Sequence, residues 1–219
     1  MKDLWDGKIL TPQSGCVRLL SLREAIVLAE VSERQHFIRQ DVDDGVFASI
    51  RYEVDSYRRY DWMSTLVFAA IYGNALLIGD QVLRAHVANR LYLAAAPRLA
   101  GMENRPCPKE VVQIDKYLAV PLGLVWRVVK PRVDLYRKGL SRIREDDGGS
   151  PEAIRFRFSG LSVEEAARLG ADDEDMENIL ADYLYLSEDD IRFARLYVRA
   201  CLAMEWPSRP GASPASTRA

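Results

Sequence analysis

Two serine-led segments that lie close together constrain the fold of this chain more than any other feature. Ser21-Leu22-Arg23-Glu24 has the spacing of a capping box, in which the serine hydroxyl accepts from the third helical residue and the glutamate reaches back. Ser32-Glu33-Arg34-Gln35 has the same spacing. Helix starts this close together predict two short helices that meet at a tight corner, a helix-turn-helix over residues 21–42.

Apolar spacing gives both predicted helices a face to bury. The first segment repeats small and apolar side chains at helical intervals, namely Leu22, Ala25, Ile26 and Ala29. In the second segment Ile38 and Val42 form an i, i+4 pair. Val31 lies between the two helices, so we expect it to pack inward.

The chain after this corner is predicted to be mostly helical, with short strands. A turn at Asp44-Gly45 precedes β-branched and aromatic residues that favour an extended strand, namely Val46, Phe47, Ile50, Tyr52 and Val54. Apolar periodicity and the positions of the prolines predict the elements that follow. These are helices over residues 57–72 and 80–95, a loop over 97–108, a short strand within 110–114, and a helical segment over about 118–144.

A domain boundary is predicted at residues 145–151, which combine like charges, two glycines and a proline without an apolar residue. Beyond it, alternating apolar and basic residues over 154–158 predict a half-buried strand. Ser162 and Ser187 begin further capping sequences, with a helix expected over 175–183 between them. The predicted fold is therefore mostly α. A helix-turn-helix domain with short strands and a helical extension (1–144) precedes the linker, and a small strand-and-three-helix domain (152–206) and a disordered tail (207–219) follow it.

Composition excludes several classes of protein. The chain is 48% hydrophobic and 28% charged, as globular proteins are, and its net charge of −2 gives no whole-chain attraction to nucleic acid or membrane. Residues 62–79 carry no formal charge, but Gly73-Asn74 interrupts them, which favours a buried helix and a turn over a membrane span. Three distant cysteines without a Cys-x-x-Cys pair favour a reducing cytoplasm.

No pattern of catalytic or metal-binding residues is found in the sequence. His36 and His86 are the only histidines and have no partner at ligand spacing, and nucleophile motifs and phosphate-binding glycine loops are absent. Nine acidic residues lie between Asp172 and Asp190 without a Lys or Arg. Several of them would cap helices, where the macrodipole favours them, although this face could also meet a basic partner. We expect a protein that is not an enzyme and has no metal or cofactor.

The second predicted helix carries residue types that read base edges in the major groove, namely Arg34, Gln35, Arg39 and Gln40. Arg51, Arg58 and Arg59 could reach phosphates from the segment that follows. However, residues 18–59 hold seven arginines against eight acids, so this region is not a basic patch. A second basic run over residues 127–144 contains only Asp134 as an opposing acid, and it is either a solvated helix face or a contact for an acidic partner.

Both ends of the chain resemble one known family. Asp182-Tyr183, Leu186-Ser187 and Asp190-Ile191, preceded by Gly170-Ala171-Asp172-Asp173, are similar to the small C-terminal domain of VapB-type antitoxins. Residues 21–25, 31–35 and 44–46 resemble the N-terminal helix-turn-helix of the same proteins, in the same order. The chain departs from the family pattern at Leu184, where proline is usual.

This resemblance implies an antitoxin of a VapBC toxin–antitoxin system. Such a protein binds and neutralises a PIN-domain ribonuclease toxin, and it binds its own operator DNA as an autorepressor. Palindromic operators would require a homodimer, for which the apolar helices between residues 62 and 96 are one candidate interface. Arg155 and Arg157 are candidate toxin-binding residues, since an arginine could enter an acidic metal site. The alternatives are a stand-alone helix-turn-helix regulator and a protein-binding scaffold whose helix-turn-helix is structural.

Overall fold

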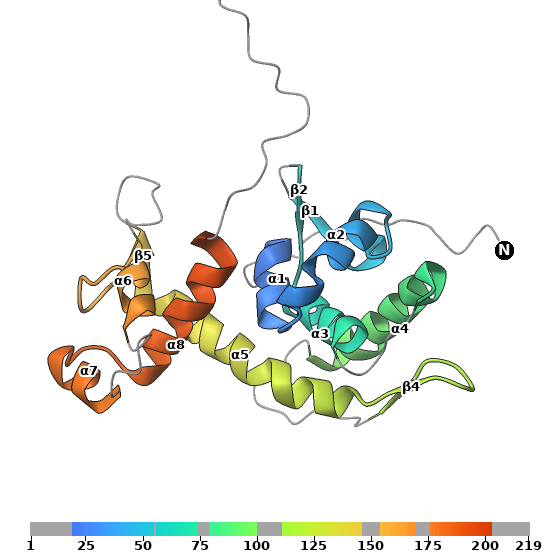
Figure 1. Ribbon diagram of the computed structural model, residues 1–219. Helices are drawn as coiled ribbons and strands as arrows, with labels where there is room; N and C mark the ends of the chain where they lie inside the picture. The colour runs from blue at the N-terminus through green and yellow to red at the C-terminus, as the bar shows by residue number, and fades with distance from the viewer. Residues whose placement is uncertain are drawn as a thin grey trace, which may run out of the picture.

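The computed structural model describes residues 19–54, 56–73, 79–99, 111–145, 154–169 and 176–202. These residues are mostly helical with a few short antiparallel strands, as predicted (Figure 1). Most of the predicted linker, the 207–219 tail and residues 100–108 of the predicted loop lie outside the described residues.

The predicted helix-turn-helix is present, although its second helix begins differently. α1 (Leu22–Leu28) has Ser21 at its N-cap with the full capping box. Ser32 was expected to cap the second helix in the same way, and that expectation is wrong. Ser32 is instead the first residue of a 3₁₀ turn, η1 (Ser32–Arg34), and α2 (Gln35–Asp43) begins after it without a side-chain cap. Before this turn the chain changes direction at Glu30, which has a positive φ of 59°, and at Val31, which is buried.

A β-hairpin follows α2 and replaces the predicted strand and the first turn of the predicted helix. Val46–Ile50 form turns and a 3₁₀ helix, η2 (Ala48–Ile50), with Phe47 and Ile50 buried in the core. β1 (Tyr52–Val54) pairs with β2 (Tyr57–Arg59), and we call this hairpin the wing. Residues 57–59 are therefore strand and not helix, because Tyr60 forms a backbone bridge with Leu20 and holds the chain extended.

Two helices complete the core of this half. α3 (Trp62–Tyr72) begins at Asp61, whose carboxylate accepts from the backbone of Ser64, and it is buried at every position from Ser64 to Ile71. α4 (Gln81–Leu99) runs past the predicted end at residue 95, so the loop predicted from residue 97 begins later. No helix within the described ranges is long and apolar enough to cross a membrane.

A long helix leads into the C-terminal part. β3 (Val112–Gln113) pairs with β4 (Ala119–Val120), and α5 (Leu122–Arg142) follows with Pro121 at its N-cap. Pro131 lies inside α5 and does not end it. The predicted helical segment is thus confirmed, with its start four residues later than residue 118.

The C-terminal unit, as we call residues 143–202, joins one hairpin to a set of short helices. It comprises β5 (Ile143–Glu145), β6 (Ile154–Phe156), α6 (Val163–Arg168), α7 (Met176–Asp182), α8 (Glu188–Tyr197) and the π-helical η4 (Val198–Leu202). The capping boxes predicted at Ser162 and Ser187 are both present. β6 is shorter than the strand predicted over 154–158, and Phe158 beyond it is exposed. β5 and β6 pair with each other, so the predicted linker falls between two hydrogen-bonded strands.

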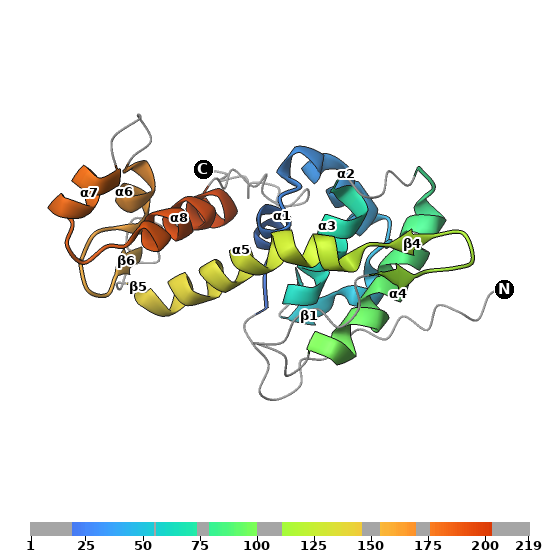
Figure 2. The same ribbon diagram turned by 90° about the horizontal axis from the view of Figure 1, so that it is seen from below.

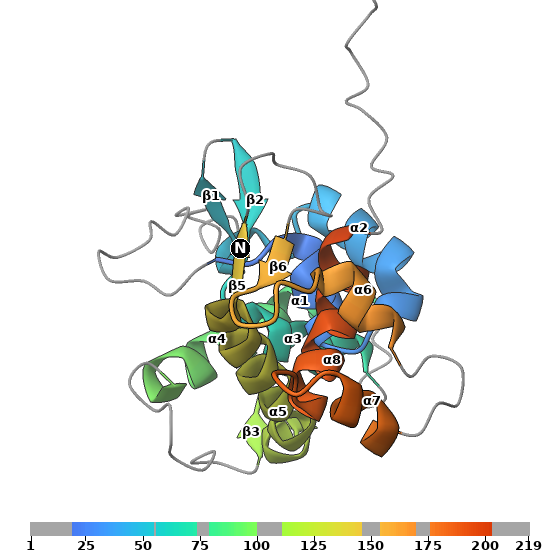
Figure 3. The same cartoon turned by 90° about the vertical axis from the view of Figure 1, so that its left-hand side faces the viewer.

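The helix-turn-helix and the C-terminal unit pack against each other. α5 extends from beside α1 and α3 to α8, and η4 lies against α1 (Figure 2). Figure 3 views the C-terminal unit end-on, with α6 and α8 side by side. At the crossing of α5 with α8, Gly139 faces the buried ring of Phe193, and that ring packs among Tyr136, Phe156 and Tyr197.

Gly139→Ala is expected to destabilise the protein by up to about 2 kcal/mol. An alanine normally stabilises a helix interior by about 1 kcal/mol relative to glycine. Here its Cβ would overlap the Phe193 ring, which its aromatic neighbours hold in place. Overpacking of this kind costs about 1–3 kcal/mol. This cost outweighs the helix-forming gain, so the substitution lowers the free energy of unfolding. Urea unfolding of both proteins measures the difference. In a Phe193→Leu background the same substitution should cost less, and an equal cost there would contradict the proposed clash.

Candidate nucleic-acid interface

The solvent face of α2 is the centre of the predicted DNA-binding site. His36, Phe37 and Gln40 are exposed, whereas Ile38 and Val42 are buried against the core as predicted. Arg34, Gln35 and Arg39 are half-buried at the edges of this face. α2 therefore presents a mixed surface of polar side chains and one aromatic ring to solvent.

The four residues predicted to read bases lie on opposite flanks of α2. Arg34 and Gln40 face a hollow of about 450 Å³ between α2, α3 and α4. The lining residues are Arg34, Phe37, Gln40, Asp41, Asp44, Ile71, Tyr72, Gly79, Gln81 and Arg84. On the other flank the side-chain amide of Gln35 faces the guanidinium of Arg39, one turn later. The structure thus separates these residues into two pairs.

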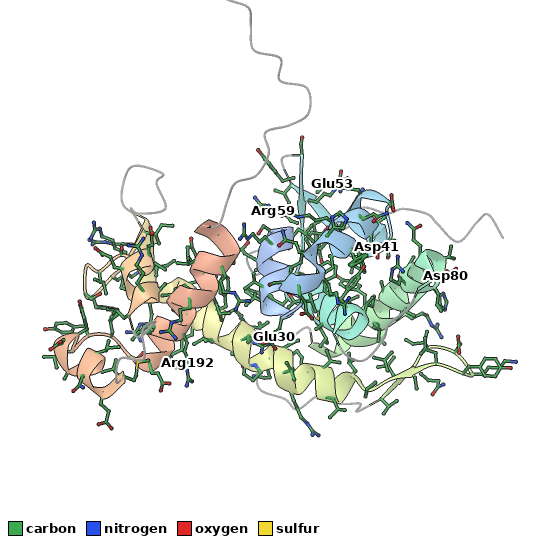
Figure 4. The ribbon with its side chains drawn as sticks, in the orientation of Figure 1. Glu30, Asp41, Glu53, Arg59, Asp80 and Arg192 are labelled. Carbon is green, nitrogen blue, oxygen red and sulfur yellow. The ribbon has the colours of Figure 1, made fainter. Side chains whose placement is uncertain are left out.

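The wing carries Arg58 and Arg59, and Arg51 directly precedes it, but each of these arginines has a partner. Arg58 forms an ion pair of 2.6 Å with Asp43 at the end of α2, and both side chains are largely exposed. Arg51 pairs with Glu53 at 3.2 Å, and the Arg59 guanidinium lies 5.7 Å from the Tyr57 ring. Figure 4 shows Glu53 and Arg59 near the wing, above the core. The positive charge of the wing is therefore partly neutralised by neighbouring acids.

A network of phenols fixes the base of the wing. The Tyr92 hydroxyl of α4 donates to Asp61 at 2.6 Å, and the Tyr52 hydroxyl of β1 donates to the same carboxylate oxygen at 3.2 Å. Asp61 is also the N-cap of α3. Burial and the Asp61 charge raise the pKa of Tyr92, so the hydroxyl remains a donor at physiological pH. The wing is thereby tied to both α3 and α4.

A buried charge cluster, which sequence reasoning did not identify, sets the position of α2. Asp41 is 3% exposed and accepts two hydrogen bonds from Arg84 of α4, at 2.6 and 2.7 Å. The Tyr72 hydroxyl of α3 also donates to it, and burial followed by this hydrogen bond raises the pKa of Tyr72. The hydrogen bond to Asp41 raises the pKa of Arg84 as well. Asp41 lies three residues after the buried Ile38, on the same side of α2, and this spacing was the available signal that it is buried.

A second buried carboxylate joins the helix-turn-helix to α5. Glu24 is 3% exposed; one of its oxygens accepts from the Ser21 backbone at 2.7 Å and the other from the Tyr136 hydroxyl at 2.8 Å. Arg23 also donates to the Arg199 carbonyl at 2.8 Å. These contacts connect α1 directly to α5 and to η4.

The basic run of residues 127–144 is largely used within the fold. Arg132 pairs with Glu30 and Lys130 with Asp134. Lys138 and Arg142 each lie 3.0 Å from an acid of α8, Asp189 and Asp190 respectively, and Arg137 lies over the Trp62 ring. Arg132, Arg137, Lys138 and Arg142 thus hold α5 against its neighbours, whereas the Lys130–Asp134 pair lies within α5.

Arg155 and Arg157, the candidate toxin-binding residues, both bond to backbone in the C-terminal unit. Arg155 donates to the Gly160 carbonyl at 2.7 Å, and Arg157 donates to the Ile143 carbonyl at 2.8 Å. They stabilise the turn after β6 and its contact with β5.

Neither histidine lies in a cluster suited to chemistry. His36 is exposed and meets Phe37 edge-to-face at 5.9 Å, and His86 is exposed on α4. Among the residues that the structure describes, no group of three or more His, Cys, Asp or Glu side chains could hold a metal ion. No family model, curated protein or solved structure matches the chain.

Arg84→Ala is expected to destabilise the protein by about 2–4 kcal/mol, because it leaves Asp41 charged and buried with only Tyr72 as a side-chain donor. Chemical unfolding monitored by circular dichroism measures the change. Arg58→Ala is the matched control: its pair with Asp43 is exposed, so its loss should cost no more than about 1 kcal/mol. Equal losses in the two variants would refute a structural role for the Asp41 cluster.

Proposed function

We propose that the chain binds DNA through α2 and the wing, as the autorepressing antitoxin of a toxin–antitoxin system. The observation that carries the DNA-binding part is the exposed face of α2 beside the wing, which carries Arg58 and Arg59. In a helix-turn-helix the second helix enters the major groove and its side chains contact base edges. Gln40 and Arg39 are of the types that recognise adenine and guanine there.

Phosphate contacts would come from the wing. The Arg58 and Asp43 side chains are 41% and 73% exposed, and exposed ion pairs contribute little free energy. A DNA phosphate can therefore take the place of Asp43 on Arg58 at small cost. Arg59, whose guanidinium lies over the Tyr57 ring, offers a further positive charge. Binding by this route is expected to depend strongly on salt.

The size of α2 supports a dimer as the DNA-binding form. Its nine residues span about 13 Å at 1.5 Å per residue, which matches about four base pairs of B-DNA. Four base pairs specify too little sequence for an operator, so two copies on a palindromic site are required. A homodimer is therefore part of the proposal.

The antitoxin part is supported by the resemblance of both chain ends to VapB-type proteins. In this function the chain would bind and neutralise a PIN-domain ribonuclease toxin in the bacterial cytoplasm, and it would have no catalytic activity. Co-expression with the product of the adjacent gene tests this part: the two proteins should co-purify, and the complex should lack ribonuclease activity. DNA binding without such a complex would instead indicate a stand-alone regulator.

For the DNA-binding part, fluorescence anisotropy with DNA from upstream of the gene should give an affinity that falls linearly with salt on logarithmic axes. Arg59→Ala should weaken binding to all sequences and lower the salt slope by about 1. Gln40→Ala should cost about 1–3 kcal/mol on the specific site and little on unrelated DNA. Arg155→Ala removes the same charge from the C-terminal unit and should bind as the wild type does. Absence of salt-sensitive binding by the purified protein would refute the proposal.

A further inference from the structure

The hollow between α2, α3 and α4 has the size and the lining of a small-molecule site. Its volume is about 450 Å³, and sites for small ligands commonly measure about 300–1,000 Å³. Phe37 of α2, which is 56% exposed, lines it together with Ile71 and Tyr72 of α3. Ligand sites typically combine apolar and aromatic side chains of this kind with a few polar groups that fix the orientation of the ligand.

The buried charge cluster holds one side of this hollow in place. Asp41, Tyr72 and Arg84 all contribute to the lining, and both other side chains donate to the Asp41 carboxylate. Arg84 also donates to the Gly79 carbonyl at 2.9 Å, just before α4. Figure 4 shows Asp41 below α2, with Asp80 beyond it at the start of α4. Because these groups are already fixed, a ligand would not have to supply the free energy of ordering them.

Arg34 supplies a cation that the fold leaves available in the hollow. It is half-buried at the end of η1, and in the described part of the chain its guanidinium has no hydrogen bond or ion pair. Asp41 is matched in charge by Arg84. Asp44, the other acid of the lining, lies ten positions after Arg34, which is about 15 Å along a helix axis. A planar carboxylate, which accepts two parallel hydrogen bonds from a guanidinium, is the natural partner of Arg34.

The charges of the lining favour a ligand with a single negative charge. Two arginines and two aspartates line the hollow, so its formal charge is balanced. A doubly charged phosphate would be attracted by Arg34 but repelled by Asp44, whereas a carboxylate needs only the charge of Arg34. The side-chain amides of Gln40 and Gln81 also line the hollow, and they can donate to or accept from other polar atoms of a ligand.

We propose that this hollow binds a small aromatic carboxylate, with the carboxylate on Arg34 and the ring against Phe37, Ile71 and Tyr72. An aromatic ring buries a large apolar area and packs well against other rings. Arg34 and Gln40 are also candidate DNA contacts, so the ligand competes with DNA for them. Ligand binding therefore weakens DNA binding. This consequence rests on the proposed function, but the ligand site itself does not.

Isothermal titration calorimetry of the full chain tests the ligand site without DNA. The probes are phenylacetate and indole-3-acetate; 3-methylindole and tryptamine share the indole ring but are neutral and positively charged. Both carboxylates should bind with a Kd below about 1 mM. The neutral and cationic probes should bind about 10-fold more weakly or less. Arg34→Ala should lower the affinity for indole-3-acetate about 10-fold, because it removes a charge-assisted hydrogen bond. Phe37→Ala should lower it several-fold.

Arg90→Ala is the matched control, because it removes the same charge from α4 outside the hollow, where Arg90 donates to the Ile114 carbonyl at 3.4 Å. It should bind indole-3-acetate as the wild type does. Melting curves of Arg34→Ala and Phe37→Ala should match the wild type, since the first loses no side-chain bond and the second loses an exposed ring. Wild-type affinity in Arg34→Ala, equally tight binding of tryptamine, or no binding of either carboxylate would overturn the inference and leave the proposed DNA binding intact.

Fluorescence anisotropy with upstream DNA tests the competition. Saturating indole-3-acetate should lower the DNA affinity of the wild type, and it should leave the DNA affinity of Arg34→Ala unchanged because that variant no longer holds the ligand. Coupling between two ligands is reciprocal, so DNA should weaken indole-3-acetate binding by the same factor. A wild-type chain that binds indole-3-acetate without any change in DNA affinity would refute the competition. A chain that binds indole-3-acetate but no DNA would refute the proposed function and retain the ligand site.

Discussion

The buried carboxylate of Glu24 is the contact on which the arrangement of this molecule depends. It completes the cap of α1 and at the same time accepts the hydroxyl hydrogen bond of Tyr136 on α5. A buried carboxylate without donors would be strongly unfavourable, so α1 and α5 are held in one relative position. α8 joins them because Gly139 lets the Phe193 ring approach α5 closely. The helix-turn-helix and the C-terminal unit therefore share a single buried contact region.

This packing leaves two exposed surfaces of different chemistry at separate places. One is the solvent face of α2 with the wing, where Arg58 and Arg59 lie next to polar side chains. The other is the turn between α7 and α8, where Tyr183, Leu184 and Tyr185 are exposed. In the proposed function the first surface meets nucleic acid. Most cations of the basic run on α5 do not belong to either surface, because they pair with Glu30, Asp134 and the acids of α8.

Predictions from the sequence succeeded where a structural feature depends on residues that are close together in the chain. The caps at Ser21, Ser162 and Ser187 involve atoms three residues apart, so the local sequence contains the whole interaction. The cap predicted at Ser32 failed because Ser32 lies inside a 3₁₀ turn that follows the positive-φ residue Glu30, three residues before α2 begins. Of the residues predicted on the second helix, Gln35, Arg39 and Gln40 lie on α2 and Arg34 lies in η1. Their division between two flanks of α2 could not be foreseen, because it depends on where α3 and α4 pack against α2.

By itself, then, the sequence determined the mostly helical composition, the corner of two short helices, and the apolar faces that become the core. These depend on periodicity and on hydrogen bonds between residues close in the chain. Only the tertiary structure decided which charged side chains pair within the fold and which remain available to a partner. Asp41 and Arg84 are 43 positions apart and Glu24 and Tyr136 are 112 apart, so no local pattern could pair them. Burial of those pairs excludes water and fixes the positions of α2 and α5, with the face of α2 left exposed.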